Sequence, residues 1–356
     1  MNDFGFGKET EILTKEGWKL ISDIVVGDEC VSYSIDKGFL ELDTVIDIAK
    51  NYNTGVIKLY HKLAEFNCGK DQLWYGWKRM WAKKGCKREK YFHKFTIPEI
   101  TQEFNILCSA KYSGGNSTVT PQEAAFIGWL LSDGYYRWSE DTKRTSSSFG
   151  NKRGVTGMIA QAQHKFYREV EQVITSVGLP YSLHEDNTGV KTSPVNKYHF
   201  HCGEFRSFMD RVVGERLPKS EINWCKHILS YTEDSIYEFL YNFWLADGDT
   251  KRDNFGGTKT TIVQNAGTVA DSVMLAMFLQ GKRVSSGFKS PNNHKCLTLR
   301  MLKNGHITMQ EVNTESVGLH DTFDILTNNG TYVIKQGSNL SITCSSSFNL
   351  RELTND

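Results

Sequence analysis

Two stretches of the chain are apolar on every side and end in an acid followed by glycine. Residues 126–136 read FIGWLLSDGYY, and residues 239–250 read FLYNFWLADGDT. A helix without a polar face must be buried all round. The pattern therefore predicts two buried helices that end in the carboxylates Asp133 and Asp247. One such ending alone would be ordinary, because glycine and aspartate are common at helix ends and turns.

The segments that follow the two acids match each other. Residues 159–178 read IAQAQHKFYREVEQVITSVG, and residues 262–281 read IVQNAGTVADSVMLAMFLQG, with isoleucine, glutamine and the closing glycine at the same places. Each predicts a short strand and then an amphipathic helix stopped by glycine. Strand-like segments follow at 197–203 and 295–302. Such a duplication predicts two similar units related by a pseudo-two-fold axis.

A pair of buried helices would bring the two acids together. The helices can pack against each other at the axis, where the small Gly128 allows a close approach. Their carboxyl ends then emerge side by side, and Asp133 and Asp247, with the last helix carbonyls at Ser132 and Ala246, are oxygen ligands suited to hard cations. Divalent ions held by paired acids suit phosphodiester cleavage, in which they activate water and stabilise the leaving oxygen. Two such centres can cut two strands.

At FIGWLLSDG and LYNFWLADG the chain resembles the single-chain homing endonucleases of the LAGLIDADG family, over about residues 119–307. The resemblance implies an α+β fold of two αββαββα units, 119–230 and 231–307, with the motif helices at their interface. It implies two or three Mg²⁺ ions at Asp133 and Asp247. It also implies a monomer that lays antiparallel strands in the major groove of double-stranded DNA with a long, specific target site.

The chain departs from this family at the position of a basic residue near each centre. The family often carries a K-x-I-P stretch before the second motif, and here GERLP has Glu215 in place of the lysine. A small residue is also common in the family where Asn242 stands, which suggests looser packing in the second helix. The candidates to replace the basic residue are Arg216 or Lys219 in the first unit, and Lys303 or Lys282 in the second.

Gln161 and Gln264 follow apolar strand residues at matching positions. They could orient a water at the metal, as catalytic residues. Equally, they could be polar residues on a strand face that touches DNA.

The two ends of the chain have a different character from its middle. Residues 5–36 are short β-type segments punctuated by glycine, and residues 322–343 read TFDILTNNGTYVIKQGSNLSIT. These segments resemble the opening and closing motifs of the Hint fold of inteins. The resemblance implies an all-β Hint-like domain built from 1–115 and 308–346, interrupted by the endonuclease at 116–307 and followed by a tail at 347–356.

Within this resemblance, the residues that protein splicing needs are absent. Gly5 stands where the first nucleophile is expected, and Gly69 and Gln72 stand where the Thr and His of a T-x-x-H stretch belong. After Ser-Ile-Thr the chain reads Cys344-Ser345 with no asparagine. We expect a splicing-defective Hint domain in which Cys344 is an ordinary thiol. The alternative is an intein that splices by variant chemistry or has been inactivated by substitution.

A basic, aromatic connector lies at residues 74–94. This concentration of charge predicts contact with DNA phosphates, although a solvated loop anchored by its aromatics is the alternative. Further basic residues fall in predicted strand-turn regions of the two repeated units. The candidate DNA-binding residues are Lys78, Arg79, Lys83, Lys84, Lys87, Arg88, Lys152, Arg153, Lys251, Arg252 and Lys259.

The composition of the chain narrows the classes of protein to which it could belong. The 356 residues carry a net charge of +1, so any basic surface must be local. The eight cysteines include no C-x-x-C pair, which argues against zinc and for reduced thiols. No apolar run is long enough to cross a bilayer, and the polar start is wrong for a signal peptide. We expect a cytoplasmic protein whose Hint segments resemble those of phage proteins. A DNA-binding protein with a dead nuclease centre, caused by Glu215, is a further alternative.

Overall fold

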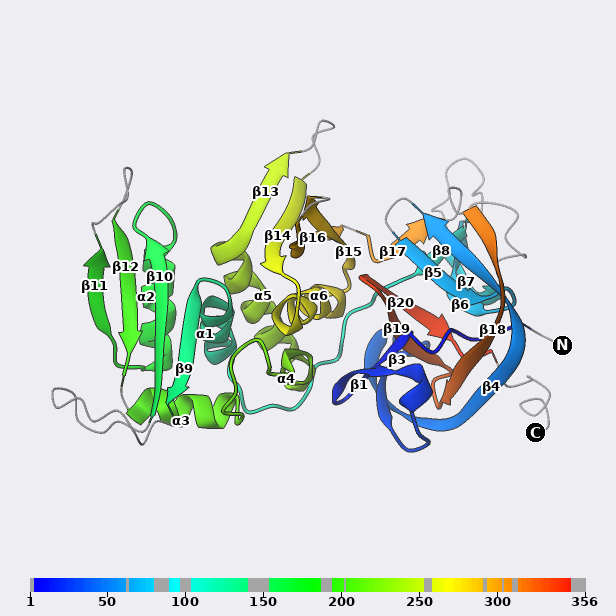
Figure 1. Ribbon diagram of the computed structural model, residues 1–356, viewed down its shortest axis with the longest axis horizontal. Coiled ribbons are helices and arrows are strands. Elements are labelled where there is room, and N and C mark those ends of the chain that lie inside the picture. The colour runs from blue at the N-terminus through cyan, green and yellow to red at the C-terminus, as the bar shows by residue number, and fades with distance from the viewer. Residues whose placement is uncertain are drawn as a thin grey trace. The chain divides into compact units, whose positions relative to one another are not determined.

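The computed structural model divides the chain into two compact units (Figure 1). The β unit comprises Met1–Ser113, Met277–Gly287 and Leu299–Asp356, and the repeat unit comprises Gly114–Ala276 and Phe288–Thr298. The expected domain boundaries after residues 115 and 307 stay predictions. The structure describes residues 3–61, 64–79, 90–96, 104–139, 154–186, 194–201, 203–252, 258–290, 293–302, 304–308 and 313–346.

The first repeat runs helix, two strands, helix, two strands, helix. Its opening helix α1 (Pro121–Leu131) starts at a capping box between Thr120 and Glu123, with proline at the first turn. The elements that follow are β9 (Gly134–Ser139), β10 (Gly154–Ala162), α2 (Tyr167–Val177), β11 (Ser182–Asp186), β12 (Val195–Phe200) and α3 (Gly203–Val212). The strands form an antiparallel sheet in the order β11-β12-β10-β9 (Figure 1).

The second repeat has the same order through its fourth strand. After the short α4 (Trp224–Ser230) come α5 (Glu233–Asp247), β13 (Gly248–Arg252), β14 (Thr258–Asn265), α6 (Thr268–Leu279), β15 (Arg283–Ser290) and β16 (Asn293–Leu302). Its sheet runs β13-β14-β16-β15. The shared element order is as the duplication in the sequence predicts. Helix α1 is buried from Glu123 to Leu131, whereas α5 exposes Tyr237 and Tyr241 and so is not buried on every side as expected.

Helices α1 and α5 pack in close contact through a glycine. A Cβ atom at Gly128 would lie 2.6 Å from the backbone oxygen of Phe239 and 3.1 Å from the nitrogen of Phe243. One helix position away, the buried indole Nε1 of Trp129 donates to Oδ1 of Asn242 at 2.9 Å. Asn242 was expected to loosen this packing, but it is buried and links the two helices through a hydrogen bond.

The β unit contains two sheets. The larger runs β18-β4-β3-β1-β19-β20, with β2 paired to β1 and β5 paired to β4. The smaller runs β17-β8-β6-β7. Phe6, Trp74 and Tyr332 lie in a common buried core, with the ring of Phe6 edge-on to the other two. The strands are β1 (Glu11–Thr14), β2 (Gly17–Leu20), β3 (Glu29–Ser34), β4 (Phe39–His61), β5 (Ala64–Gly69), β6 (Leu73–Arg79), β7 (Lys90–Thr96), β8 (Phe104–Leu107), β17 (His306–Thr308), β18 (Asn313–Thr327), β19 (Thr331–Gln336) and β20 (Asn339–Cys344).

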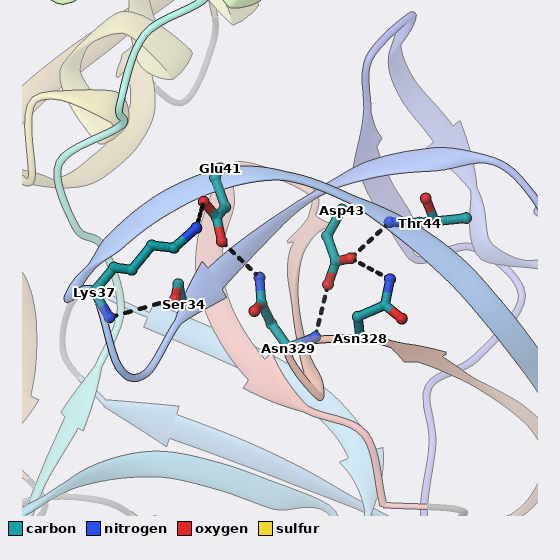
Figure 2. A network of polar contacts seen from close by, with 7 residues as sticks. All are labelled: Ser34, Lys37, Glu41, Asp43, Thr44, Asn328 and Asn329. Atoms are coloured by element: carbon teal, nitrogen blue, oxygen red, sulfur yellow. Dashed lines mark hydrogen bonds and ion pairs between the residues drawn. The ribbon is translucent and has the colours of Figure 1, made fainter.

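A polar network holds the turn between β18 and β19 against β4 (Figure 2). Asp43 accepts hydrogen bonds from the side-chain amide of Asn328 at 2.8 Å and from the backbone N–H of Asn329 at 2.7 Å. The Asn329 amide donates to Glu41, which is also paired with Lys37. The side chains of the two asparagines thus fix this turn.

Most of the described cysteines are buried, and burial limits the reactivity of their thiols. Cys30, Cys68 and Cys344 are buried free thiols, and burial raises the pKa of each to about 12. Thiols with so high a pKa are poor nucleophiles at neutral pH. Among the described residues, no group of three or more His, Cys, Asp or Glu side chains could hold a metal ion. No helix in the described part of the chain is long and apolar enough to span a membrane.

Candidate active site at the ends of two buried helices

The two candidate carboxylates lie at equivalent helix ends and act on each other electrostatically. Asp133 stands two residues after α1, and Asp247 is the last residue of α5. Both are half-buried. Burial and the negative charge of Asp133 raise the pKa of Asp247 to about 6. The charge of Asp133 acts on Asp247, so the two carboxylates lie near each other.

Positive groups partly offset the cost of placing two acids together. Burial also raises the pKa of Asp133, while Lys165, a hydrogen bond from Gln161 and Lys219 act in the opposite direction. The same two lysines oppose the rise in the pKa of Asp247. The site therefore contains two carboxylates under the influence of two cations.

The matched glutamines are held in the same way in both repeats. Gln161 receives the backbone N–H of Ala162 at its Oε1 and donates from Nε2 to Oδ2 of Asp133 at 2.8 Å. Gln264 receives the N–H of the next residue in the same manner, and its Nε2 lies 3.5 Å from Oδ2 of Asp247. Each amide N–H thus points at the carboxylate of its own repeat, with a shorter contact in the first.

Of the two basic candidates in the first unit, Lys219 belongs to this site. Its Nζ donates to the backbone oxygens of Leu131 at 3.0 Å and Gly134 at 2.7 Å, the residues on either side of the Ser132-Asp133 turn. Burial lowers the pKa of Lys219, and the charges of Asp247 and Asp133 act to raise it. A lysine at the carboxyl end of α1 is also favoured by the helix dipole.

Arg216 does not lie in this arrangement. Its guanidinium pairs with the carboxylate of Asp210 at 3.1 Å and lies over the ring of Trp138, and its side chain is 57% exposed. Glu215, which stands where the family lysine is expected, faces His227 with 3.6 Å between Oε1 and Nε2. The sequence analysis offered Arg216 and Lys219 as substitutes, and of these two the structure brings only Lys219 to the two acids. Lys303 lies outside the described residues.

Ser132 and Ala246, the two other proposed metal-ligand positions, differ from each other in their surroundings. The hydroxyl of Ser132 donates back to the carbonyl oxygens of Gly128 at 2.9 Å and Trp129 at 3.2 Å, extending the helix end. Ala246 is buried inside α5.

Lys165 was missed by the sequence analysis. It lies four residues after Gln161, and the matched position in the second repeat is Thr268. A lysine four residues after the matched glutamine of the first repeat, with no counterpart in the second, is the signal that could have found it.

Few of the candidate DNA-binding side chains lie in the described part of the chain. Lys78 is half-buried on β6, and Lys90 of β7 lies over the ring of Trp77, 4.6 Å from its centroid. Phe92 is exposed beside Trp77, with 5.2 Å between ring centroids. The positions Arg79, Lys251, Arg252 and Lys259 fall on strands β6, β13 and β14, and their side chains are not described. Lys83, Lys84, Lys87, Arg88, Lys152 and Arg153 lie outside the described residues.

In the β unit, the buried amide of Gln72 links Gly5 to the end of the last strand. Gln72 accepts the backbone N–H of Gly5 at its Oε1, at 2.8 Å. Its Nε2 donates to the carbonyl oxygen of Cys344 at 2.8 Å and to Oγ1 of Thr343 at 3.0 Å. The hydroxyl of Ser345 is buried, with no hydrogen-bond partner within the described part of the chain. The chain's opening segment and its last strand are thus joined through Gln72.

The backbone at two of these positions excludes larger residues. Gly5 has a φ of +95°, and a Cβ atom there would lie 2.6 Å from the backbone oxygen of Phe323. At Gly69 a Cβ atom would lie 2.5 Å from the backbone oxygen of Asp3. A cysteine at residue 5 or a threonine at residue 69 would therefore require the opening segment to move.

Comparisons with known proteins give distant likenesses only. No protein-family model and no curated protein matches the chain. The homing endonuclease I-DmoI, solved in complex with DNA and Ca, is similar over 52% of this chain and 85% of that chain, with 12% identity and a TM-score of 0.36. Meganuclease I-SmaMI bound to DNA covers 53% of this chain and 80% of its own, with 13% identity and a TM-score of 0.31. Full-length DUF199/WhiA from Thermatoga maritima covers 52% of each chain, with 13% identity and a TM-score of 0.29. These values establish no family for the chain.

Proposed function

We propose that this chain is a site-specific, divalent-metal-dependent DNA endonuclease of the LAGLIDADG type that carries a splicing-defective Hint-like domain. The observation that carries the proposal is the coupling of Asp133 and Asp247 at the ends of two packed helices, which raises the pKa of Asp247 to about 6. Two acids forced together at matching helix ends are an unfavourable arrangement for a purely structural core. A bound divalent cation would remove that repulsion.

Asp133 and Asp247 are the residues that would hold Mg²⁺. Two or three such ions, when bound, would supply activation of water and stabilisation of the leaving oxygen in each strand. The half-buried, mutually repelling carboxylates fit this role, because hard cations prefer carboxylate oxygens. Gln161 and Gln264 hold the carboxylates in place through their amide N–H groups.

Lys219 places a positive charge beside the acids and fixes the turn that presents Asp133. Its two hydrogen bonds to Leu131 and Gly134 hold the backbone on both sides of that turn. An ammonium in this position could also stabilise negative charge that develops on a phosphate. We therefore assign to Lys219, and not to Arg216, the basic role in this site.

The partner in this proposal is double-stranded DNA with a long, specific target site, bound by a cytoplasmic monomer. Exposed side chains on β7, including Lys90 and Phe92, support a contribution of the connector to DNA binding. The neutral Gln72 clamp and the positive φ of Gly5 support the loss of splicing. Splicing by variant chemistry gains no such support. The alternative of a DNA-binding protein with an inactive nuclease centre is disfavoured, because Lys219 supplies the positive charge that Glu215 does not.

The decisive experiment is cleavage of a library of long duplexes by the full chain with Mg²⁺. The Asp133→Asn, Asp247→Asn double variant and the Lys219→Met variant are assayed beside it. We expect specific double-strand cuts that the double variant loses and that Lys219→Met slows by about 10²-fold or more. Lys226→Met, at an exposed position on α4, serves as the matched control and should cut normally.

Two results would contradict the proposal. Cutting that survives in the double variant would place the chemistry elsewhere. Specific binding without any cutting in Mg²⁺ or Mn²⁺ would favour the binding protein with a dead centre.

A further inference from the structure

One face of the first sheet carries a row of histidines. Along β12, Tyr198 and Phe200 are fully buried, and Phe200 packs on aromatic rings of α1 and α3. Because side chains alternate along a strand, Lys197 and His199 point to the opposite face. His201 follows the end of β12, and its ring stacks on that of His199. His201 is exposed, while Lys197 and His199 are partly exposed. The side of the sheet away from the helices is therefore basic and accessible.

The imidazoles lie close enough to influence one another. The rings of His199 and His201 are stacked, with centroids 5.6 Å apart and planes at 15°. On the neighbouring strand β11, His184 pairs in register with Lys197, which makes it a diagonal neighbour of His199. Burial lowers the pKa of His199, and the positive charges of His201, His184 and Lys197 lower it further.

Few negatively charged groups described on this face of the sheet oppose the lowering of the His199 pKa. Asp186 of β11 is already paired with Lys197 at 2.5 Å. On β10 the residues opposite His199 and Lys197 are Met158 and Ala160, which carry no charge.

The remaining strand of the sheet, β9, adds a cation. Tyr135 and Arg137 are exposed there and stand in register with Met158 and Thr156 of β10. Without a ligand, the described groups around His199 therefore disfavour a further positive charge.

We propose that His184, His199 and His201 form a DNA-contacting row, in which His199 takes up a proton when a duplex binds. The inference rests on the proposed function, because it requires that the open face of this sheet meets DNA. An alternating strand whose outward side chains are basic and polar offers donors to phosphates and to the acceptor groups of bases in the major groove. A protonated imidazole donates from both ring nitrogens, whereas a neutral one donates from one.

The direction of the pH effect follows from linkage. The pKa of His199 is lowered in the free protein, so its ring is mainly neutral at neutral pH. Phosphates near the row favour the charged form and raise the pKa in the complex. DNA binding then consumes protons, and affinity rises as the pH falls. Each proton taken up contributes about a tenfold gain in affinity per pH unit between the free and bound pKa values.

The test measures DNA affinity of the full chain in EDTA, so that no cleavage occurs, from about pH 8 to about pH 6, the range in which histidine titrates. The probe is a duplex selected for binding from a randomised library. The variant His184→Gln, His199→Gln, His201→Gln keeps polar side chains of similar size but cannot be protonated. His320→Gln changes an exposed histidine of β18 and is the matched control. Calorimetry in buffers of different ionisation heat counts the protons taken up.

The parent chain and His320→Gln should bind about tenfold or more tightly at the lower end of this range, with uptake of at least about one proton. The triple variant should lose both the pH dependence and the proton uptake while still binding. If the triple variant keeps the full pH dependence, the row is not its source and the inference fails, although the proposed function stands. If the parent chain binds no duplex at any pH, the proposed function fails and the inference fails with it.

Discussion

The indole N–H of Trp129 on α1 donates to the side-chain oxygen of Asn242 on α5 at 2.9 Å, inside the helix pair that carries both candidate acids. The amide of Asn242 in turn donates to the backbone oxygen of Glu238. A buried polar link of this kind fixes the register of two helices that are otherwise apolar. It lies close to Gly128, where the helix backbones approach most tightly.

Replacing Asn242 with leucine should destabilise the chain by about 1–3 kcal/mol, because the buried indole N–H of Trp129 loses its acceptor. Chemical denaturation measures the free energy of unfolding. Trp129→Phe removes the donor instead, and the double variant should be less destabilised than the sum of the two single variants. Strict additivity would show that the hydrogen bond does not couple the helices.

Gly128→Ala should separate the two helices. The added methyl group would lie 2.6 Å from the backbone oxygen of Phe239, and neither atom can rotate away. We expect a loss of about 1–3 kcal/mol in the free energy of unfolding, together with reduced DNA cleavage as Asp133 and Asp247 move apart. Gly203→Ala is the control, since a Cβ atom there has no neighbour within 4 Å. Equal effects of the two substitutions would count against close packing at Gly128.

The repeat was readable from the sequence because hydrophobic patterning fixes buried helices directly. Phe126 to Leu131 has no polar face, and α1 is buried along its length. The matched Gln161 and Gln264 were visible in the same way, and both point at the acid of their own repeat. The buried helix and the matched glutamines could be predicted because they follow from the local hydrophobic pattern and from the regular spacing of the two repeats.

The basic member of the site was harder to predict, because side-chain direction depends on tertiary contacts. Arg216 and Lys219 are three residues apart, and neither is distinguished by periodicity. The attraction of Asp210 and the ring of Trp138 turns Arg216 away, whereas Lys219 finds the helix-end carbonyls of Leu131 and Gly134. Asn242 was misjudged for a similar reason, since its partner Trp129 lies on the other helix.

Gln72→Ala should strongly destabilise the β unit. The substitution leaves the buried N–H of Gly5 and the carbonyl oxygen of Cys344 without their side-chain partner. Two buried polar groups that lose a hydrogen bond cost roughly 2–4 kcal/mol in the free energy of unfolding. Gln172→Ala, at an exposed position of α2, should change stability by less than about 0.5 kcal/mol. A thermal-unfolding comparison checks both, and a neutral Gln72→Ala would mean that the clamp is not structural.

Restoring a nucleophile should not restore splicing. Gly5→Cys combined with Gln72→His would place a side chain at a φ of +95°, with its Cβ 2.6 Å from the oxygen of Phe323. The strained cysteine cannot take the geometry of the present backbone. With a folded reporter fused before the chain, mass spectrometry should find the fusion at full length, in the parent and in the double variant. A released reporter or a ligated flank would instead support the variant-splicing interpretation.

Asp247→Asn should stabilise the metal-free chain above about pH 6. Burial and the charge of Asp133 raise the pKa of Asp247 from 3.8 to about 6 in the folded state, so the folded chain holds this proton more tightly than the unfolded chain. Its contribution to stability is therefore present below about pH 4 and is lost as the pH rises through about 6. At pH values near 8 the asparagine should gain on the order of 1–2 kcal/mol, allowing for solvent screening. Melting temperatures in EDTA across this range measure the effect, and Asp249→Asn, at an exposed position of β13, provides the control.

Added Mg²⁺ should then raise the melting temperature of the parent chain but not of Asp247→Asn. If Mg²⁺ does not change the melting temperature of the parent chain, the proposed binding of this ion at Asp133 and Asp247 is contradicted.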